Sequence, residues 1–475
     1  SASLMMLKAF YSVAGAGNVE KLMIDFSIGR GFFVEARGNF VLNQEFLDAV
    51  KAKMREYVER KIPIMKRSVS TDDAIELFEK LGMYDKARLF RYRMVSRVNI
   101  YSIDGFEDYY YGYMVQNTGY IKHFDLIPYH YGFVMVMPDR KTPDVLHRFT
   151  PSDKLFATLS ESTEWGRRMD LETVGALNDR IAKGDMSHLI LIQEALQEKK
   201  IAEIAAQIAA RKNARFVMIA GPSSSGKTTT NDRLGRILEL AGIHAHMISM
   251  DDYYRTSGTY DIPFDEENGV NDLESPECMD LDLLRDHLTR LVAGEEIMVP
   301  RFDFETRTSH RNERAVQLHK DEIVMIEGIH AFNPVIMGDL EKHATSVYLS
   351  VASVLLTDHN IRVEPHMLRF LRRAMRDSLF RSSPVEYTLK QWNSVRRGER
   401  LYISPYRGQA DLTVDTYLPY ETNILMQYLS EKLQGEEKML EQADLAPLSA
   451  ILDRVSPIDY KPYMPEDSVL HEFIG

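Results

Sequence analysis

The chain has 475 residues, 44% of them apolar and 27% charged, with a formal net charge of −12. This length exceeds that of one typical hydrophobic core and predicts two or three domains, and the acidic balance argues against broad binding to nucleic acid. The one cysteine, Cys278, excludes an internal disulfide framework and a cysteine-rich zinc site, and it fits a reducing cytoplasm. No apolar run reaches the roughly eighteen residues of a membrane span, so no membrane partner is expected.

Residues 1–150 are predicted to form an α+β domain. The runs KLMIDFSI and FVMVMPD are typical of strands, and two other stretches repeat apolar residues at helical spacing. LNQEFLDAVKAKMREYVERK begins at an Asn cap, and STDDAIELFEKLG has a Ser or Thr cap, early acidic residues and a closing glycine. The tyrosine-rich stretch DGFEDYYYGYMVQNTGY is interpreted as a sheet face or loop. The opening SASLMML lacks an initiator methionine, which suggests added residues or a truncation upstream.

Residues 151–213 are predicted to be a helical connector, because the segment that ends IQEALQEKKIAEIAAQIAARKNA is rich in strong helix formers. From Arg215 onward, helical segments alternate with short strand-like runs: RFVMIA, HAHMISM, EIVMIEG, SVYLSV and DLTVDT. This alternation predicts an α/β domain over residues 214–435, with a parallel sheet covered by helices on both faces. Residues 436–475 form a C-terminal extension.

A phosphate-binding loop is expected after the first of these strands. The stretch GPSSSGKT fits the pattern G-x-x-x-x-G-K-[ST], with a strand-like run before it and a clear helix after it. In such a loop the backbone N–H groups bind phosphate oxygens, Lys227 neutralises the β and γ phosphates, and the Thr228 hydroxyl binds Mg²⁺. The predicted ATP-binding residues are Gly221, Pro222, Ser223, Ser224, Ser225, Gly226, Lys227, Thr228 and Thr229.

Two later strand ends carry acidic residues suited to phosphoryl transfer. The second strand ends in SMDDYYR, where either Asp251 or Asp252 would accept the proton of an attacking hydroxyl. The run EIVMIEG ends near Glu327, where P-loop proteins place the acid that orients Mg²⁺ and its water, so Thr228 and Glu327 are the predicted metal residues.

The segment from Arg369 to Arg407 concentrates positive charge in an acidic protein, with nine arginines and one lysine against three acidic residues. Four of these arginines (369, 372, 373 and 376) recur at helical spacing. One interpretation is a solvated helix face. The other is a mobile lid, at about residues 362–407, that closes arginines over the transferring phosphoryl group.

The motif order GPSSSGKTT, DDYY, SPECMD, PRFDF, IEGI, RRAMRD resembles the uridine kinase branch of the uridine kinase/phosphoribulokinase family over roughly residues 214–421. This resemblance implies that Asp251 is the general base and that Arg376 and Arg381 face the phosphates. It also implies a nucleoside site formed by Tyr254, by Glu274 on the ribose hydroxyls and by Arg373 paired with the ribose.

Two positions depart from the pattern of that family. PRFDFETRTSH has Phe302 and Phe304 but places Arg307 where a base-contacting histidine would fall, and Ser383 replaces a lid arginine. The aromatic pocket is kept while the pyrimidine-reading groups are not, so a nucleoside is expected without a specified base.

Within residues 1–150, the run from GFFVEARGNF to YIKHFDL resembles the second N-terminal domain of threonyl-tRNA synthetase, an editing domain. The Cys/His pair of that domain falls on Tyr110 and Met114, and its histidine pair falls near Ser3 and Leu7. The resemblance therefore implies a retained scaffold without editing activity or metal. A subset of bacterial-type nucleoside kinases looks like this fusion, and its further segments WNSVRRGE and YKPYMPEDSVLHEFIG are both present.

Together these features predict a cytoplasmic, Mg²⁺-dependent ATP:nucleoside 5′-phosphotransferase whose partners are ATP and a nucleoside, and the resemblance allows a homo-oligomer. Two alternatives remain open: a kinase of another small hydroxylated acceptor, such as a sugar phosphate, and a nucleotide-gated regulator that binds RNA or protein.

Overall fold

The computed structural model describes residues 1–92, 96–110, 112–139, 142–211, 215–338, 343–353, 355–358, 361–451 and 454–475. Two compact units account for the chain. Unit 1 comprises residues 1–184, 353–364 and 447–456, and unit 2 comprises residues 185–352, 365–446 and 457–475. The expected boundary at 213/214 lies outside the described residues, and the expected connector of residues 151–213 is shared between the two units.

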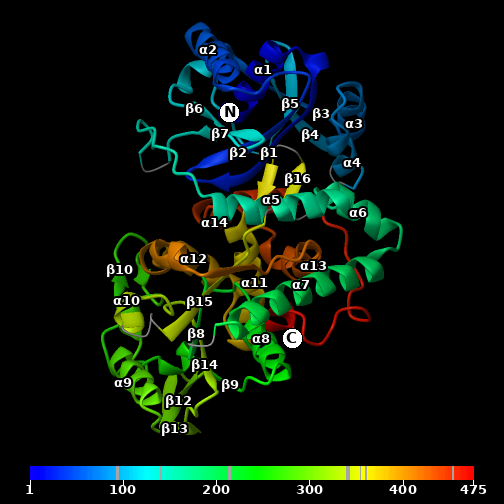
Figure 1. The fold of residues 1–475 in the computed structure, drawn as a ribbon. Coiled ribbons are helices and arrows are strands. Elements are labelled where there is room, and N and C mark those ends of the chain that lie inside the picture. The colour runs from blue at the N-terminus through cyan, green and yellow to red at the C-terminus, as the bar shows by residue number, and fades with distance from the viewer. Residues whose placement is uncertain are drawn as a thin grey trace. The chain divides into compact units, whose positions relative to one another are not determined.

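Unit 1 is an α+β unit with antiparallel sheets (Figure 1). Its helices are α1 (Ala2–Ala14), α2 (Gln44–Arg60), α3 (Thr71–Lys80), α4 (Tyr84–Phe90), α5 (Asp153–Arg168) and α6 (Val174–Ala182). One sheet has the order β1-β2-β7-β6, formed by β1 (Val19–Ile28), β2 (Gly31–Gly38), β7 (Gly132–Val136) and β6 (Asp125–Tyr129). A second has the order β3-β4-β5, formed by β3 (Ile64–Ser70), β4 (Arg97–Ile103) and β5 (Phe106–Tyr109). The hairpin of β16 (Leu355–Asp358) and β17 (Ile361–Val363) also belongs to unit 1.

The two capped helices predicted in this region are both present. Asn43 caps α2 by accepting a hydrogen bond from the Phe46 N–H (2.8 Å), and Ser70 caps α3 by accepting one from the Asp73 N–H (3.1 Å). Each cap satisfies one of the N–H groups that a helix start leaves without a partner.

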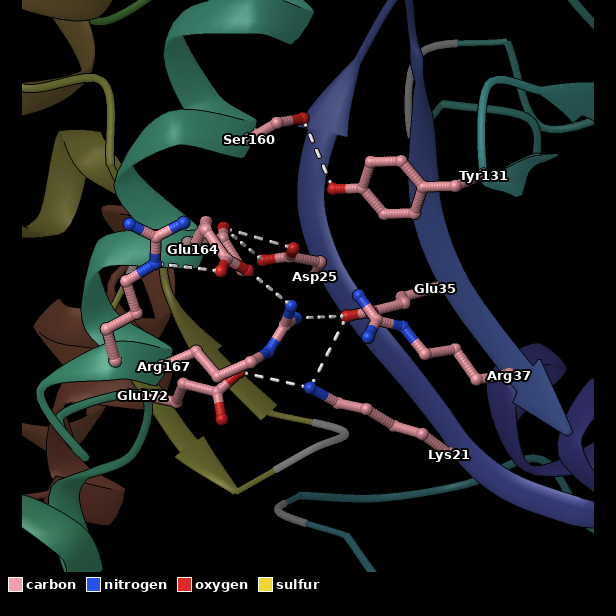
Figure 2. A network of polar contacts seen from close by, with 11 residues as sticks. Lys21, Asp25, Glu35, Arg37, Tyr131, Ser160, Glu164, Arg167 and Glu172 are labelled. Atoms are coloured by element: carbon pink, nitrogen blue, oxygen red, sulfur yellow. Dashed lines mark hydrogen bonds and ion pairs between the residues drawn. The ribbon is translucent and has the colours of Figure 1, made fainter.

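A buried polar network joins α5 to the first sheet of unit 1 (Figure 2). Glu35 on β2 is fully buried and lies near three cations, with oxygen–nitrogen distances of 3.4 Å to Lys21, 2.5 Å to Arg37 and 2.8 Å to Arg167. Asp25 on β1 is also buried, and it accepts a hydrogen bond from the Thr163 hydroxyl (3.1 Å). Burial raises the pKa of Asp25 to about 7. Sequence patterns did not indicate this network, because α5 begins more than one hundred residues after β1 and β2.

Unit 2 is built on a five-stranded parallel sheet in the order β18-β15-β8-β14-β9. Its strands are β8 (Phe216–Ala220), β9 (Ala245–Ser249), β14 (Ile323–Gly328), β15 (Ala344–Ser350) and β18 (Leu412–Asp415). Each coincides with one of the five predicted strand-like runs, which confirms the α/β prediction. The P-loop and the predicted acids therefore lie at the carboxyl ends of the strands, where open α/β sheets bind their ligands.

Side chains that alternate along these strands pack into two separate hydrophobic clusters, one on each face of the sheet. Val217 and Ile219 pack with residues of α7 (Met186–Ala209) and α8 (Lys227–Leu240). Phe216 and Met218 pack with residues of α9 (Leu281–Val292) and of the hairpin formed by β12 (Ile297–Asp303) and β13 (Thr308–Val316). The helices on both faces of the predicted sheet are thus confirmed.

Unit 2 has further helices and strands, most of which are labelled in Figure 1. They are β10 (Phe264–Asp265), β11 (Val270–Asn271), β12 (Ile297–Asp303), β13 (Thr308–Val316), α10 (Pro334–Met337), α11 (Pro365–Phe380), α12 (Val385–Gly398), α13 (Glu421–Leu433), α14 (Glu437–Gln442) and α16 (His471–Ile474). The first residue of α15 (Ala446–Ile451) is assigned to unit 2 and its other residues to unit 1. Among the described residues, no helix combines the length and the apolar character that crossing a membrane requires.

Candidate functional site

The predicted phosphate-binding loop connects β8 to α8. Its backbone requires glycine at both ends of the motif. A Cβ atom on Gly221 would lie 2.2 Å from the Leu349 carbonyl oxygen, and Gly226 has a φ of +81°, in the left-handed region that L side chains rarely adopt. Lys227 is buried and donates a hydrogen bond to the Pro222 carbonyl (3.2 Å), so its ammonium group folds back over the loop.

Polar groups that could bind a nucleotide and Mg²⁺ converge at this loop. The Ser224 hydroxyl oxygen is buried without a hydrogen-bond partner among the described residues, which fits a place for a phosphate oxygen. Glu327, at the end of β14, accepts hydrogen bonds from the Thr228 hydroxyl (3.4 Å) and the Ser249 hydroxyl (2.7 Å). Hard divalent cations prefer such carboxylate and hydroxyl oxygens. The oxygen atoms of Thr228 and Glu327 therefore fit the chemistry of Mg²⁺.

The surroundings of the Glu327 carboxyl group disfavour its charged form. Burial, together with the nearby Asp251 carboxylate, raises its pKa to about 7. Lys227 and the Ser249 hydroxyl act in the opposite direction. A carboxylate in such surroundings gains from a bound cation, because the cation compensates the cost of its buried charge.

The two neighbouring acids at the end of β9 differ in their surroundings. Asp251 lines the cavity beside the P-loop. Asp252 instead accepts a hydrogen bond from the Phe302 N–H (3.2 Å), which attaches the β9 end to β12. Burial, with the Asp251 charge, raises the pKa of Asp252. Asp251 is thus the acid that faces the cavity, whereas Asp252 makes a structural contact.

A single cavity of about 510 Å³ brings most of the predicted residues together. Its lining includes Ser223, Ser224, Lys227, Thr228, Asp251, Tyr254, Glu274, Phe302, Phe304, Arg307, Glu327, Arg373, Arg376 and Arg381. Five other predicted residues belong to the loop without lining the cavity: Gly221, Pro222, Ser225, Gly226 and Thr229.

One wall of the cavity is aromatic. The ring centroids of Tyr254 and Phe302 are 5.6 Å apart, and those of Phe302 and Phe304 are 5.1 Å apart with the rings nearly perpendicular. Arg307 is exposed at the rim, and its φ of +53° places it in a tight turn of the hairpin. Such a wall offers ring faces to a flat apolar or heteroaromatic group.

Another part of the lining is cationic and comes from α11 and from Arg381, which follows this helix directly. Arg373 donates hydrogen bonds to Glu274 and to the Ser223 hydroxyl, both at 2.9 Å, so it connects the predicted ribose residue with the P-loop. The guanidinium carbon of Arg381 lies 4.1 Å from the Phe304 ring centroid. Such a stacked position suits a cation that also faces an anionic ligand.

Asp377 organises these cations. Its carboxylate lies 3.2 Å from Arg373, 3.2 Å from Arg376 and 3.7 Å from Arg381. Burial opposes its ionisation, but the three guanidinium groups hold the pKa of Asp377 below its usual range. Asp377 was not singled out from the sequence, although it stands four residues from both Arg373 and Arg381, a spacing that places side chains on one helix face.

The two other arginines of the predicted helix face are buried, which corrects the solvated-face interpretation. Arg372 is fully buried and binds Glu421 (2.5 Å) and the Thr416 carbonyl (2.8 Å). Arg369 is also buried and binds Glu399 (2.5 Å). Both therefore anchor α11 within unit 2, while Arg373 and Arg376 reach the cavity.

Two further residues of the site were missed by sequence reasoning. Ser249 is the last residue of β9 and stands two positions before Asp251. Its place at this strand end could therefore have been recognised from the sequence. Glu472 also lines the cavity, and no sequence pattern connects it to a loop more than two hundred residues away.

Comparisons with solved structures give low global similarity. A structure described as a possible uridine kinase from Bacillus stearothermophilus has a TM-score of 0.30 and 21% identity, covering 46% of this chain and 98% of that chain. D-glycerate 3-kinase from Cryptococcus neoformans has a TM-score of 0.25 and 16% identity, covering 54% of this chain and 87% of that chain.

Sequence comparisons are more specific. The chain is 28% identical over 220 residues to a uridine kinase of Halobacterium salinarum, covering 46% of this chain and 86% of that protein. It is 28% identical over 204 residues to a uridine kinase of Borreliella burgdorferi, covering 42% and 86%. The model of the Phosphoribulokinase / Uridine kinase family matches residues 216–422. The C-terminal half of the chain therefore contains a P-loop domain of the phosphoribulokinase/uridine kinase family.

Proposed function

We propose that this protein is an ATP-dependent nucleoside kinase that transfers the γ-phosphoryl group of Mg·ATP to the 5′-hydroxyl of a nucleoside. One observation carries the proposal: a single cavity is lined by Lys227 and Thr228 of the P-loop, by Asp251, and by an aromatic wall. Phosphoryl transfer requires these groups together, because catalysis consists largely of positioning the reactants and stabilising charge.

In this proposal each wall of the cavity has a role. The P-loop residues from Gly221 to Thr229 hold the triphosphate, and Thr228 and Glu327 hold Mg²⁺, which would neutralise charge on the phosphate oxygens. Asp251 accepts the proton of the attacking hydroxyl, and Lys227, Arg376 and Arg381 stabilise charge on the transferring group. Of the predicted lid, Arg373, Arg376 and Arg381 line the cavity, and they would cover the bound phosphates and exclude water.

The nucleoside is proposed to lie between the aromatic wall and the Glu274–Arg373 pair. Tyr254, Phe302 and Phe304 would contact the base, with Arg307 at the rim, and Glu274 would accept hydrogen bonds from the ribose hydroxyls. The carboxylate of Glu274 already accepts a hydrogen bond from Arg373 (2.9 Å), so it is fixed in place. The base is left open, because Arg307 and Ser383 stand where the related family has base- and phosphate-reading groups.

A kinase of another small hydroxylated acceptor is the second candidate. A sugar phosphate would need cations beyond those that face ATP, whereas three aromatic rings at the acceptor side favour a base.

Residues 1–150 are proposed to be a synthetase-like scaffold without editing chemistry. Tyr110, where the editing domain would have a cysteine, is buried in the hydrophobic core of unit 1, and Met114 packs against the same core. Neither side chain is a metal ligand of the kind that a zinc or hydrolytic site needs.

The test is ADP release with Mg·ATP against uridine, cytidine, adenosine, guanosine, inosine and ribulose 5-phosphate, with Asp251→Asn measured beside the whole chain. Stimulation by one or two nucleosides, abolished in Asp251→Asn, is expected. Stimulation by ribulose 5-phosphate alone would favour the second candidate. A slow ATPase rate that ignores every acceptor and persists in Asp251→Asn would contradict both kinase readings and favour the nucleotide-gated regulator.

A further inference from the structure

Helix α16 (His471–Ile474) brings a carboxylate to the phosphate-binding loop. The Glu472 Oε2 atom accepts hydrogen bonds from both the N–H and the hydroxyl of Thr229, each at 3.2 Å. Thr229 lies in the first turn of α8, and Glu472 lines the same cavity as Lys227 and Thr228. Figure 1 shows this C-terminal segment beside α8.

The residues around Glu472 fix it in this position. Leu470 and Phe473 are fully buried, and the Phe473 ring centroid lies 5.1 Å from the guanidinium carbon of Arg372 on α11. A Cβ atom on Gly226 would lie 2.4 Å from a methyl carbon of Val469, so the segment is in close contact with the P-loop itself. Packing of the neighbouring residues therefore holds the Glu472 backbone in place within unit 2. This packing does not depend on the Glu472 side chain.

The Thr229 donors are groups that a P-loop offers to phosphate. Backbone N–H groups at the start of the helix after the loop point toward the α and β phosphates, and the helix dipole favours an anion there. A carboxylate satisfies both requirements, because it is anionic and accepts hydrogen bonds from two donors. A phosphate oxygen and the Glu472 carboxylate cannot accept from the same Thr229 groups at once, and two anions in contact repel each other.

We propose that Glu472 is an intrinsic competitor of the nucleotide phosphates and sets the affinity of the site for ATP and ADP. Its carboxylate leaves the Thr229 donors when the phosphates bind, and it returns when they dissociate. Rotation of its own side chain is sufficient, because Leu470 and Phe473 keep α16 in place. This inference rests on the nucleotide site of the proposed function and adds a residue that regulates it.

The test compares the affinity of Mg·ADP for the whole chain and two charge-matched variants by isothermal titration calorimetry. Glu472→Gln removes the competing charge and is expected to bind Mg·ADP roughly tenfold more tightly, the size of one charge-assisted hydrogen-bond contact. Glu466→Gln is the control, because Glu466 is exposed in the same segment and its substitution removes the same charge. It should bind as the parent does.

A second substitution at position 472 tests whether a folding defect affects the result. Glu472→Ala should tighten Mg·ADP binding to a similar extent, since the gain comes from losing the anion, and both variants should melt as cooperatively as the parent. Unchanged affinity in both variants would overturn the inference. Weaker affinity would also overturn it, since Glu472 would then help to bind the nucleotide.

The outcomes separate this inference from the proposed function. Tighter Mg·ADP binding in Glu472→Gln, without nucleoside-dependent turnover in any protein, would support the competitor and contradict the kinase. Nucleoside-dependent turnover with equal Mg·ADP affinity in parent and variants would support the kinase and contradict the competitor.

Discussion

Asp377 is the residue on which the cationic wall of the cavity depends. One carboxylate lies within 4 Å of three guanidinium groups that would otherwise repel each other. Without it, Arg373 would keep its contact with Glu274, but the three guanidinium groups would lose the carboxylate that they share and that offsets their mutual repulsion. The arrangement explains how a short stretch of helix presents several arginines toward one cavity.

Asp377→Asn is therefore expected to lower kcat/KM for phosphoryl transfer, roughly tenfold or more, because the asparagine keeps the shape but not the charge that aligns the arginines. Glu386→Gln, an exposed acid on the next helix, is the matched control and should behave as the parent. Steady-state ADP release measures both. Equal kinetics in all three proteins would show that the arginines do not need Asp377.

Asp25 in unit 1 makes stability depend on pH. Its folded-state pKa of about 7 lies above the ordinary value of 3.8, because burial disfavours the charged form. The folded state therefore holds the proton more tightly than the unfolded chain. The resulting stabilisation is fully present below about pH 4 and is lost as the pH rises through 7.

Asp25→Asn is expected to stabilise unit 1 at pH 8, by up to about 4 kcal/mol, since it removes a buried charge. The gain should shrink toward pH 5, where Asp25 in the parent is protonated. Thermal denaturation from pH 5 to pH 8 measures it, with Asp144→Asn, at an exposed position, as control. A gain in stability that grows as the pH falls would contradict a raised pKa for Asp25.

At the scale of elements, the strands of unit 2 were predictable because each is a short β-branched run followed by a helical segment. The cap residues Asn43 and Ser70 were predictable for a similar reason, since capping depends on a few neighbouring positions. The strand order was not predicted, because local patterns do not determine which strands pair. Asp377 had a local signal in its spacing, whereas Glu472 had none.

Helix α11 combines a functional and a structural face. Arg373 and Arg376 reach the cavity, while Arg372 is fully buried against Glu421 of α13, which is also fully buried. Helical spacing predicted that these arginines share a helix. It could not tell which of them are buried, because the covering residues, among them Phe473, come from distant segments.

Arg372→Met is expected to destabilise unit 2 by about 3–5 kcal/mol, because Glu421 would remain buried without its cation. The double variant Arg372→Met/Glu421→Leu should recover most of this loss, since it removes the charge as well. Urea denaturation of the three proteins measures the difference. A single variant as stable as the parent would show that water reaches Glu421.

At the scale of the whole molecule, each compact unit is assembled from separate pieces of chain. Unit 1 includes residues 353–364 and 447–456, which interrupt the sequence of unit 2. Leu355 and Val363 of the first piece are buried, and Leu356 pairs with Thr173 in a parallel bridge. The predicted lid begins at about residue 362, whereas residues 362–364 belong to unit 1. Composition and motifs do not reveal such exchange of segments, because nothing in a short apolar run specifies its distant partner.

We propose above that the P-loop cavity transfers a phosphoryl group from ATP to a nucleoside hydroxyl, with Asp251 as the base. The most direct measurement follows the label of γ-labelled ATP in the products formed by the whole chain and by Asp251→Asn. We expect label on the 5′-oxygen of a nucleoside, and a rate of transfer that is roughly 10²- to 10⁴-fold lower in Asp251→Asn with Mg·ATP binding retained. Label found only in inorganic phosphate, or an Asp251→Asn variant as active as the parent, would contradict it.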